Sequence, residues 1–181
     1  MKRLLVLLLC TSAVFLSCKD NQIGSALTSA EISMNDNPES SLEILESIDR
    51  DLLSTRKQKA KFALLYSMAL DKNYIDIKTD SIIAPAVIYY ENHGAKEERF
   101  LCNYYHARIY ENCGDKENAL LCAIKAESVD TSKVSSQSKY LLYALKGRIY
   151  QQEWRFHESI EAYILACRYS LLSNKFRHYA Y

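Results

Sequence analysis

The sequence contains two short stretches that decide how its fold is interpreted, ARIY at residues 107–110 and GRIY at residues 147–150. The two stretches lie 40 residues apart, and the same interval aligns Ala126 with Ala166. Self-similarity at a fixed interval in this range is typical of helical repeats, in which each unit packs only on its neighbours. The pattern therefore predicts a stack of similar helical units.

Each unit is expected to be a hairpin of two helices that cross at small residues. Ala107 and Gly147 lie where the first helix of a hairpin crosses the second, and a larger side chain there would push the helices apart. Offsets of four and seven residues place a stripe of mostly small side chains on one face of each second helix. The stripe consists of Ala119, Ala123 and Ala126 in one unit, and of Ser159, Tyr163 and Ala166 in the next.

The composition also indicates a helical chain. The 181 residues are 49% hydrophobic and 25% charged, and they include only four Gly and two Pro. Because the turns of sheet proteins depend on Gly and Pro, this scarcity argues against a fold of many short strands. The formal net charge is +1, so the chain has no broad positive field and we expect no nucleic-acid partner.

Helical periodicity divides the chain into successive pairs with short connections. The pairs are expected over residues 25–48, 57–92, 96–128 and 136–172, and a last helix is expected to begin at residue 174. The predicted fold is therefore all-α, a right-handed stack of antiparallel helical hairpins over residues 25–181. The sequence stops inside the last helical pattern, which suggests a helix recorded only in part or a truncated product.

The two later hairpins resemble the tetratricopeptide repeat, whose first helix carries a small residue followed by Tyr and whose second carries two Ala around a large residue. The matching residues are Ala107, Tyr110, Ala119 and Ala126 in one hairpin, and Gly147, Tyr150, Tyr163 and Ala166 in the other. The 40-residue interval exceeds the usual one of about 34 residues. The resemblance implies an α-solenoid whose first helices line a concave groove for extended peptides.

The first 17 residues are expected to be an export signal. Two cations, Lys2 and Arg3, precede an apolar run over residues 4–16, which as a helix rises about 20 Å and is too short to span a membrane. The sequence from Phe15 to Cys18 resembles a bacterial lipobox, which implies a lipid on Cys18 and a tether over residues 18–24. The alternative is an ordinary secretory signal with an incidental cysteine.

The lipobox together with the tyrosine-rich pairs resembles exported tetratricopeptide lipoproteins of anaerobic gut bacteria. This resemblance implies a location in the cell envelope, anchored to the outer membrane through the N-terminal lipid only. It also implies a non-catalytic scaffold that binds a protein or a peptide. The alternative is the sensor portion of a truncated envelope signalling or transcriptional regulator.

The family pattern also implies which residues face the groove. The expected partner-binding residues are Tyr104, Arg108, Asn112, Arg148, Gln151 and Gln152. The guanidinium groups of Arg108 and Arg148 are expected to stack on one wall and to hold a carboxylate or a peptide backbone in bidentate fashion. The alternative is a solvated face on which Arg108 pairs with Glu111 of its own helix.

No constellation for catalysis, metal binding or a cofactor is evident. His157 and Glu158 begin an HExxH-like pattern, but residue 161 is Glu, so the second metal ligand is missing. The mature part has four cysteines in no CxxC pair, and they are expected to be small buried apolar residues, with a disulfide as the alternative. These cysteines are Cys102, Cys113, Cys122 and Cys167.

Overall fold

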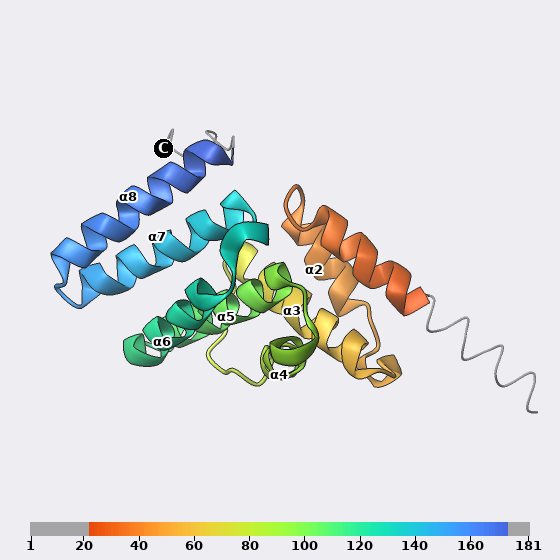
Figure 1. The fold of residues 1–181 in the computed structure, drawn as a ribbon. Helices are drawn as coiled ribbons and strands as arrows, with labels where there is room; N and C mark the ends of the chain where they lie inside the picture. Colours follow the sequence, from red (N-terminus) through yellow and green to blue (C-terminus); the bar gives the residue numbers. More distant parts are fainter. Residues whose placement is uncertain (1–21, 174–181) are drawn as a thin grey trace, which may run out of the picture. The chain divides into compact units, whose positions relative to one another are not determined.

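Residues 22–173 are described by the structure, which is a computed structural model (Figure 1). Every regular element in that range is a helix, so the all-α class expected from the sequence is confirmed. The chain divides into two units, the first ending at Ile75 and the second beginning at Asp76.

The N-terminal expectations fall mostly outside the described residues. Cys18, the signal over residues 1–17 and the helix expected from residue 174 all lie outside them. A helix covers residues 22–33, so the described end of the expected tether, residues 22–24, is helical and not a linker.

Between residues 22 and 75, the described part of the first unit, three α-helices share one core. The helix over residues 22–33 is followed by α2 (Pro38–Glu46), a short 3₁₀ helix (Arg50–Leu52) and α3 (Arg56–Lys72). Pro38 lies in the first turn of α2, and Asn37 Oδ1 accepts a hydrogen bond from the backbone N–H of Ser40, which explains where α2 begins. The core is formed by Ile23, Leu27, Ala30, Met34, Leu45, Leu53, Phe62, Leu65 and Ala69.

The first two helices of this unit cross at a pair of small residues. Ala30 and Ser41 are both fully buried, and Ser41 Oγ donates a hydrogen bond of 2.9 Å to the carbonyl oxygen of Ala30. The short side chains let the two backbones approach closely, and the buried hydroxyl finds its acceptor on the facing helix.

The described part of the second unit, residues 76–173, contains five α-helices. Their bounds are α4 (Ala84–His93), α5 (Lys96–Asn112), α6 (Lys116–Ser128), α7 (Ser136–Gln152) and α8 (Phe156–Leu172), with a 3₁₀ helix (Thr131–Lys133) between α6 and α7. Helices α5 and α6 pack as one hairpin and α7 and α8 as the next, while α7 also contacts both α5 and α6 (Figure 1). Helix α4 packs on α5.

The hairpins expected over residues 96–128 and 136–172 are therefore present and in contact with each other. The pair expected over residues 57–92 has a different environment. Its two helices are α3 and α4, and α3 packs on α2 within the first unit whereas α4 packs on α5 within the second.

The crossing of α7 and α8 confirms why position 147 is small. A Cβ atom on Gly147 would lie 2.8 Å from the ring of Tyr163, closer than side-chain carbons approach in proteins. Ser159 Oγ donates a hydrogen bond of 2.9 Å to the carbonyl oxygen of Gly147 at the same crossing. In the preceding hairpin the equivalent residues, Ala107 and Ala119, are both fully buried.

The 40-residue interval extends to three helices. Helices α3, α5 and α7 begin at residues 56, 96 and 136 and end at residues 72, 112 and 152. Two residues after each end the backbone is left-handed, with φ of 59° at Tyr74, 76° at Gly114 and 59° at Trp154. The next N–H in each case bonds back to a carbonyl five residues earlier, as in a Schellman motif. The structure thus contains a third copy of this helix end that the sequence analysis missed.

Candidate functional site

The arginines expected on one wall converge on a single carboxylate. Arg108 of α5 forms an ion pair with Glu111 one turn further along its own helix. Arg148 of α7 reaches the same Glu111 with two hydrogen bonds of 3.0 Å, from Nε to Oε1 and from Nη2 to Oε2. The side chain of Glu111 is only 8% exposed, so the carboxylate is held between the two guanidinium groups and joins α5 to α7.

The outer part of this cluster is open to solvent. The side chain of Arg148 is 42% exposed and that of Arg108 is 21% exposed. A guanidinium has five N–H donors, and Glu111 occupies two of those on Arg148. The other three have no partner among residues 22–173. Gln151 and Gln152 are both exposed, and Gln151 Oε1 accepts a hydrogen bond from the hydroxyl of Tyr163.

The alternative pairing of Arg108 with Glu111 on its own helix is confirmed, and it coexists with the expected proximity of the two arginines. Tyr104 is a correction, because it is 4% exposed and therefore cannot meet a partner on an open groove. Its ring packs edge-to-face on that of Tyr105 with a centroid distance of 4.8 Å. Asn112, the last residue of α5, is half-buried.

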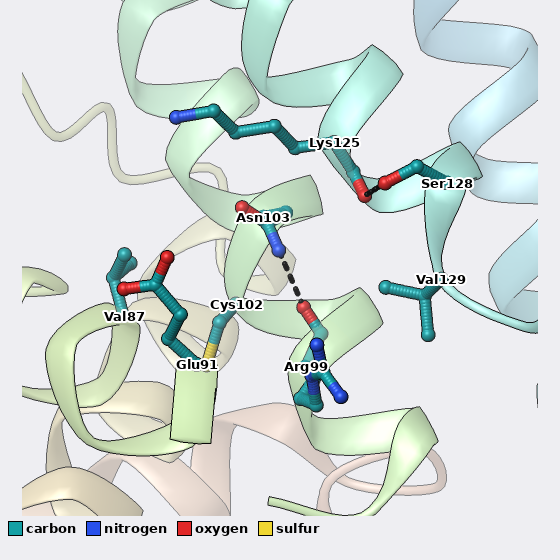
Figure 2. A pocket seen from close by; sticks show the side chains of 8 residues that line it. All are labelled: Val87, Glu91, Arg99, Cys102, Asn103, Lys125, Ser128 and Val129. Atoms are coloured by element: carbon teal, nitrogen blue, oxygen red, sulfur yellow. Dashed lines mark hydrogen bonds between the residues drawn. The ribbon is translucent and has the colours of Figure 1, made fainter.

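A separate pocket of about 300 Å³ lies in the second unit (Figure 2). It is lined by residues of α4, α5 and α6 and of the segment after α6: Val87, Glu91, Arg99, Cys102, Asn103, Lys125, Ser128 and Val129. Two cations and one carboxylate therefore share an open, partly apolar hollow. Two of its polar side chains are already bonded to the backbone, since Asn103 Nδ2 donates to the carbonyl of Arg99 and Ser128 Oγ to that of Lys125.

None of the four cysteines beyond the N-terminal segment forms a disulfide. Cys102 and Cys122 are buried, as expected, whereas Cys113 and Cys167 are exposed. Burial raises the pKa of the Cys102 thiol well above its usual range, and nearby Glu98 adds to the effect. Burial also raises the pKa of Cys122. These two thiols are consequently inert toward chemistry that needs a thiolate.

Within residues 22–173 no group of His, Cys, Asp and Glu side chains is arranged to hold a metal ion. His157 Nδ1 lies 3.8 Å from Glu161 Oε1 on the exposed surface of α8. His106 is different, because its Nε2 is buried without a hydrogen-bond partner and lies 3.9 Å from Asp80 Oδ2. Burial lowers the pKa of His106, and this effect outweighs the opposing influence of Asp80.

Comparison of the chain with models of protein families, with curated proteins and with solved structures finds no match. Among the helices of residues 22–173, none has both the length and the apolar composition that crossing a membrane requires. A function for this chain must therefore be inferred from the arrangement of its own side chains.

Proposed function

We propose that the chain is a non-catalytic helical-repeat scaffold, a right-handed tetratricopeptide-like solenoid that binds a protein or peptide partner in the bacterial cell envelope. The observation that carries this proposal is the meeting of Arg108 and Arg148, from two successive hairpins, at one carboxylate. Such an arrangement fixes two guanidinium groups on one surface in defined orientations. Less side-chain conformational entropy is then lost when a partner binds.

The partner contact is expected at the outer edge of Arg148. The three guanidinium N–H groups that Glu111 does not use, together with the amide of Gln151, form a set of donors at the end of α7. Carboxylates and peptide carbonyl groups are the acceptors that such a planar donor set recognises. We infer that the partner presents an acidic side chain or an extended backbone there.

A site-specific crosslink tests this site. The full chain is produced with a photoreactive amino acid in place of Gln152, which is exposed beside Arg148, and is irradiated in envelope preparations. The reference chain carries the photoreactive group at Lys59, an exposed residue of α3 in the first unit. We expect a defined protein adduct from position 152 and not from position 59, identified by mass spectrometry.

The role of Arg148 is tested in the same experiment. Arg148→Ala leaves the ion pair between Arg108 and Glu111 in place, so the fold is retained, and we expect the adduct to fall about tenfold, as for the loss of one charge-assisted contact. Arg56→Ala, at an exposed arginine of α3, is the matched control and leaves the adduct unchanged. An adduct of equal yield with Arg148→Ala would remove this residue from the proposed site.

The lipid anchor is an independent part of the proposal. Attachment of two or three acyl chains at Cys18 would hold the protein on the outer membrane, because each buried methylene contributes about 0.8 kcal/mol. The intact mass of the protein purified from its native membrane measures this directly. A mass equal to that of an unmodified chain beginning at residue 18 or elsewhere contradicts the anchor and leaves the scaffold proposal intact.

A further inference from the structure

The outer side of α8 carries a row of exposed apolar residues. Ile160 is 60% exposed, Ile164 is 62% exposed and Leu171 is 57% exposed, and Cys167, between the last two, is exposed as well. The intervals of four, three and four residues are those of a heptad seam, the pattern with which two helices wind around each other. A contiguous exposed apolar row of this kind marks a surface for contact with another protein surface.

The opposite side of α8 is already covered by α7. Ala162, Ala166 and Ser170 are buried there, and Tyr163 packs against Gly147. The exposed row is therefore not the face that holds the hairpin together. We call the row formed by Ile160, Ile164, Cys167 and Leu171 the α8 seam.

The equivalent side of α6, forty residues earlier, is covered only in part, because Glu127 contacts α7 whereas Ile124, the counterpart of Ile164, is 47% exposed. Glu127, the counterpart of Cys167, forms an ion pair with Lys146 and accepts a hydrogen bond from the hydroxyl of Tyr143, both on α7. Leu120, the counterpart of Ile160, is half-buried. The α8 seam is thus more exposed than the equivalent side of α6, where Glu127 bonds to α7.

Two charged residues flank the α8 seam and define its partner. Glu161 and Arg168 directly follow Ile160 and Cys167, so they occupy equivalent positions along the same edge of the seam. Both are exposed. In an antiparallel pair of helices such positions face each other, so Glu161 of one helix lies opposite Arg168 of the other. In a parallel pair they face the positions of Tyr163 and Ser170, which offer no charge.

We propose that the α8 seam binds a second copy of this chain, with the two α8 helices antiparallel around a two-fold axis. Ile160 then lies opposite Leu171 of the second copy and Ile164 opposite Cys167 of the second copy. Glu161 pairs with Arg168 of the second copy, and the symmetry makes this contact twice. The same helix supplies both halves of the interface, as an isologous dimer requires.

Sedimentation equilibrium of the full chain in density-matched detergent, which reports the protein mass alone, tests the proposal. We expect a dimer for the parent chain and a monomer for Ile164→Glu, which places two carboxylates near the axis. The matched control is Ile88→Glu, at an isoleucine of α4 that is 72% exposed, and it retains the dimer. Circular dichroism confirms that all of these variants keep the helical fold.

A charge exchange tests the antiparallel geometry. Glu161→Lys and Arg168→Glu each create two repulsive contacts, and we expect each to weaken dimerisation about tenfold or more. The chain that carries both substitutions restores the opposite charges and should dimerise as the parent does. Failure of the double variant to recover contradicts the antiparallel pairing.

Two further results would overturn the proposal. One is a parent chain that stays monomeric at every concentration reached. The other is a parent that is monomeric and loses thermal stability on Ile164→Glu, which would show that the chain's own residues 174–181 cover the α8 seam. Neither result bears on Arg148, which belongs to α7, so the proposed function and this dimer are tested separately.

Discussion

Position 147 illustrates how the absence of one side chain sets the distance between two helices. A Cβ atom there would lie 2.8 Å from the Tyr163 ring, so the ring must move before an alanine is accommodated. Alanine is a better helix former than glycine by about 1 kcal/mol, but overpacking of a close contact costs more. We expect Gly147→Ala to lower the free energy of unfolding by about 1–2 kcal/mol, measured by urea denaturation.

The control for this prediction is Gly24→Ala. Nothing lies within 4 Å of a Cβ placed on Gly24, so only the helix preference of alanine acts and the protein should become slightly more stable. Tyr163→Leu combined with Gly147→Ala should lose less stability than the sum of the two single variants, because the smaller side chain removes the clash. Simple additivity would contradict the crossing contact.

The residues with left-handed backbone after α5 and α7 are a glycine, Gly114, and a tryptophan, Trp154, so opposite substitutions can be made at equivalent positions. An L-residue in this conformation costs about 1–2 kcal/mol, and Trp154 bears that cost while 80% of its surface is exposed. We expect Trp154→Gly to raise the free energy of unfolding by about 0.5–1 kcal/mol, part of the gain being offset by the flexibility of glycine in the unfolded chain.

The reverse substitution is Gly114→Ala, at the equivalent place after α5, where φ is 76° and no atom lies within 4 Å of an added Cβ. It should lower the free energy of unfolding by about 1 kcal/mol, since only backbone strain is introduced. Urea titrations of both variants measure the two changes. Changes of the same sign at positions 114 and 154 would show that these helix ends are not equivalent.

At the scale of elements, Glu111 joins α5 to α7 through two arginines. Glu111→Gln removes the charge that Arg108 and Arg148 share in a mostly buried position. We expect a loss of about 1–3 kcal/mol, as for a buried charge-assisted network that keeps its cations. Glu46→Gln, at an exposed residue of α2, should change stability by less than about 0.5 kcal/mol. Equal effects of the two substitutions would contradict the bridging role.

The bounds expected for the two later hairpins, residues 96–128 and 136–172, coincide with the start of α5, the end of α6, the start of α7 and the end of α8. Small residues at the crossings and side chains such as Asp115, which caps α6, mark these boundaries in the sequence. The third copy of the interval, in α3, escaped because the residue equivalent to Ala107 and Gly147 is Ser67 and the left-handed residue is Tyr74. Ser is not the residue that the repeat pattern has at the first position, and Tyr is not typical of a left-handed backbone. Only the backbone geometry therefore identifies this copy.

The candidate site was predicted in part. The resemblance to a repeat family implied that Arg108 and Arg148 share one wall, and the structure brings both to Glu111. Tyr104 was misplaced because a family pattern assigns a helix face but does not show which side chains cover it, and Tyr104 is buried with its ring packed edge-to-face on that of Tyr105. The pocket was missed because its residues come from α4, α5, α6 and the segment after α6, and share no spacing along the chain.

At the scale of the whole molecule, several described groups of the second unit have shifted pKa values that make stability depend on pH. The pKa of His106 is lowered from its ordinary value of 6.5 by burial. As the pH falls below about 6.5, the unfolded chain therefore binds a proton at this residue before the folded chain does. The free energy of unfolding must then decrease with falling pH, until the lower pKa of the folded state is reached.

Carboxylates act in a separate and more acidic window. Hydrogen bonds from Asn118 lower the pKa of Asp115, and those from Lys96 and Ser132 lower the pKa of Asp130. A carboxylate of this kind contributes stability at pH values above its pKa in the unfolded chain, which is near 4. This contribution is lost as the pH falls through the lower pKa of the folded state. His106→Gln should therefore remove the decrease that begins near pH 6.5 and leave the decrease below about pH 4.

The alkaline side of the profile begins with the buried thiols, and above about pH 10 Tyr143 and Tyr110 add to it, because burial raises the pKa of both phenols. Burial raises the pKa of Cys102 and Cys122 above the ordinary value of 9.0, so above about pH 9 the unfolded chain loses protons that the folded chain keeps, and stability falls. We expect maximum stability between about pH 7 and pH 8.5. Urea titrations across this range, under reducing conditions, measure the profile. Cys102→Ala with Cys122→Ala should flatten its alkaline side, and an unchanged alkaline slope would show that other groups control it.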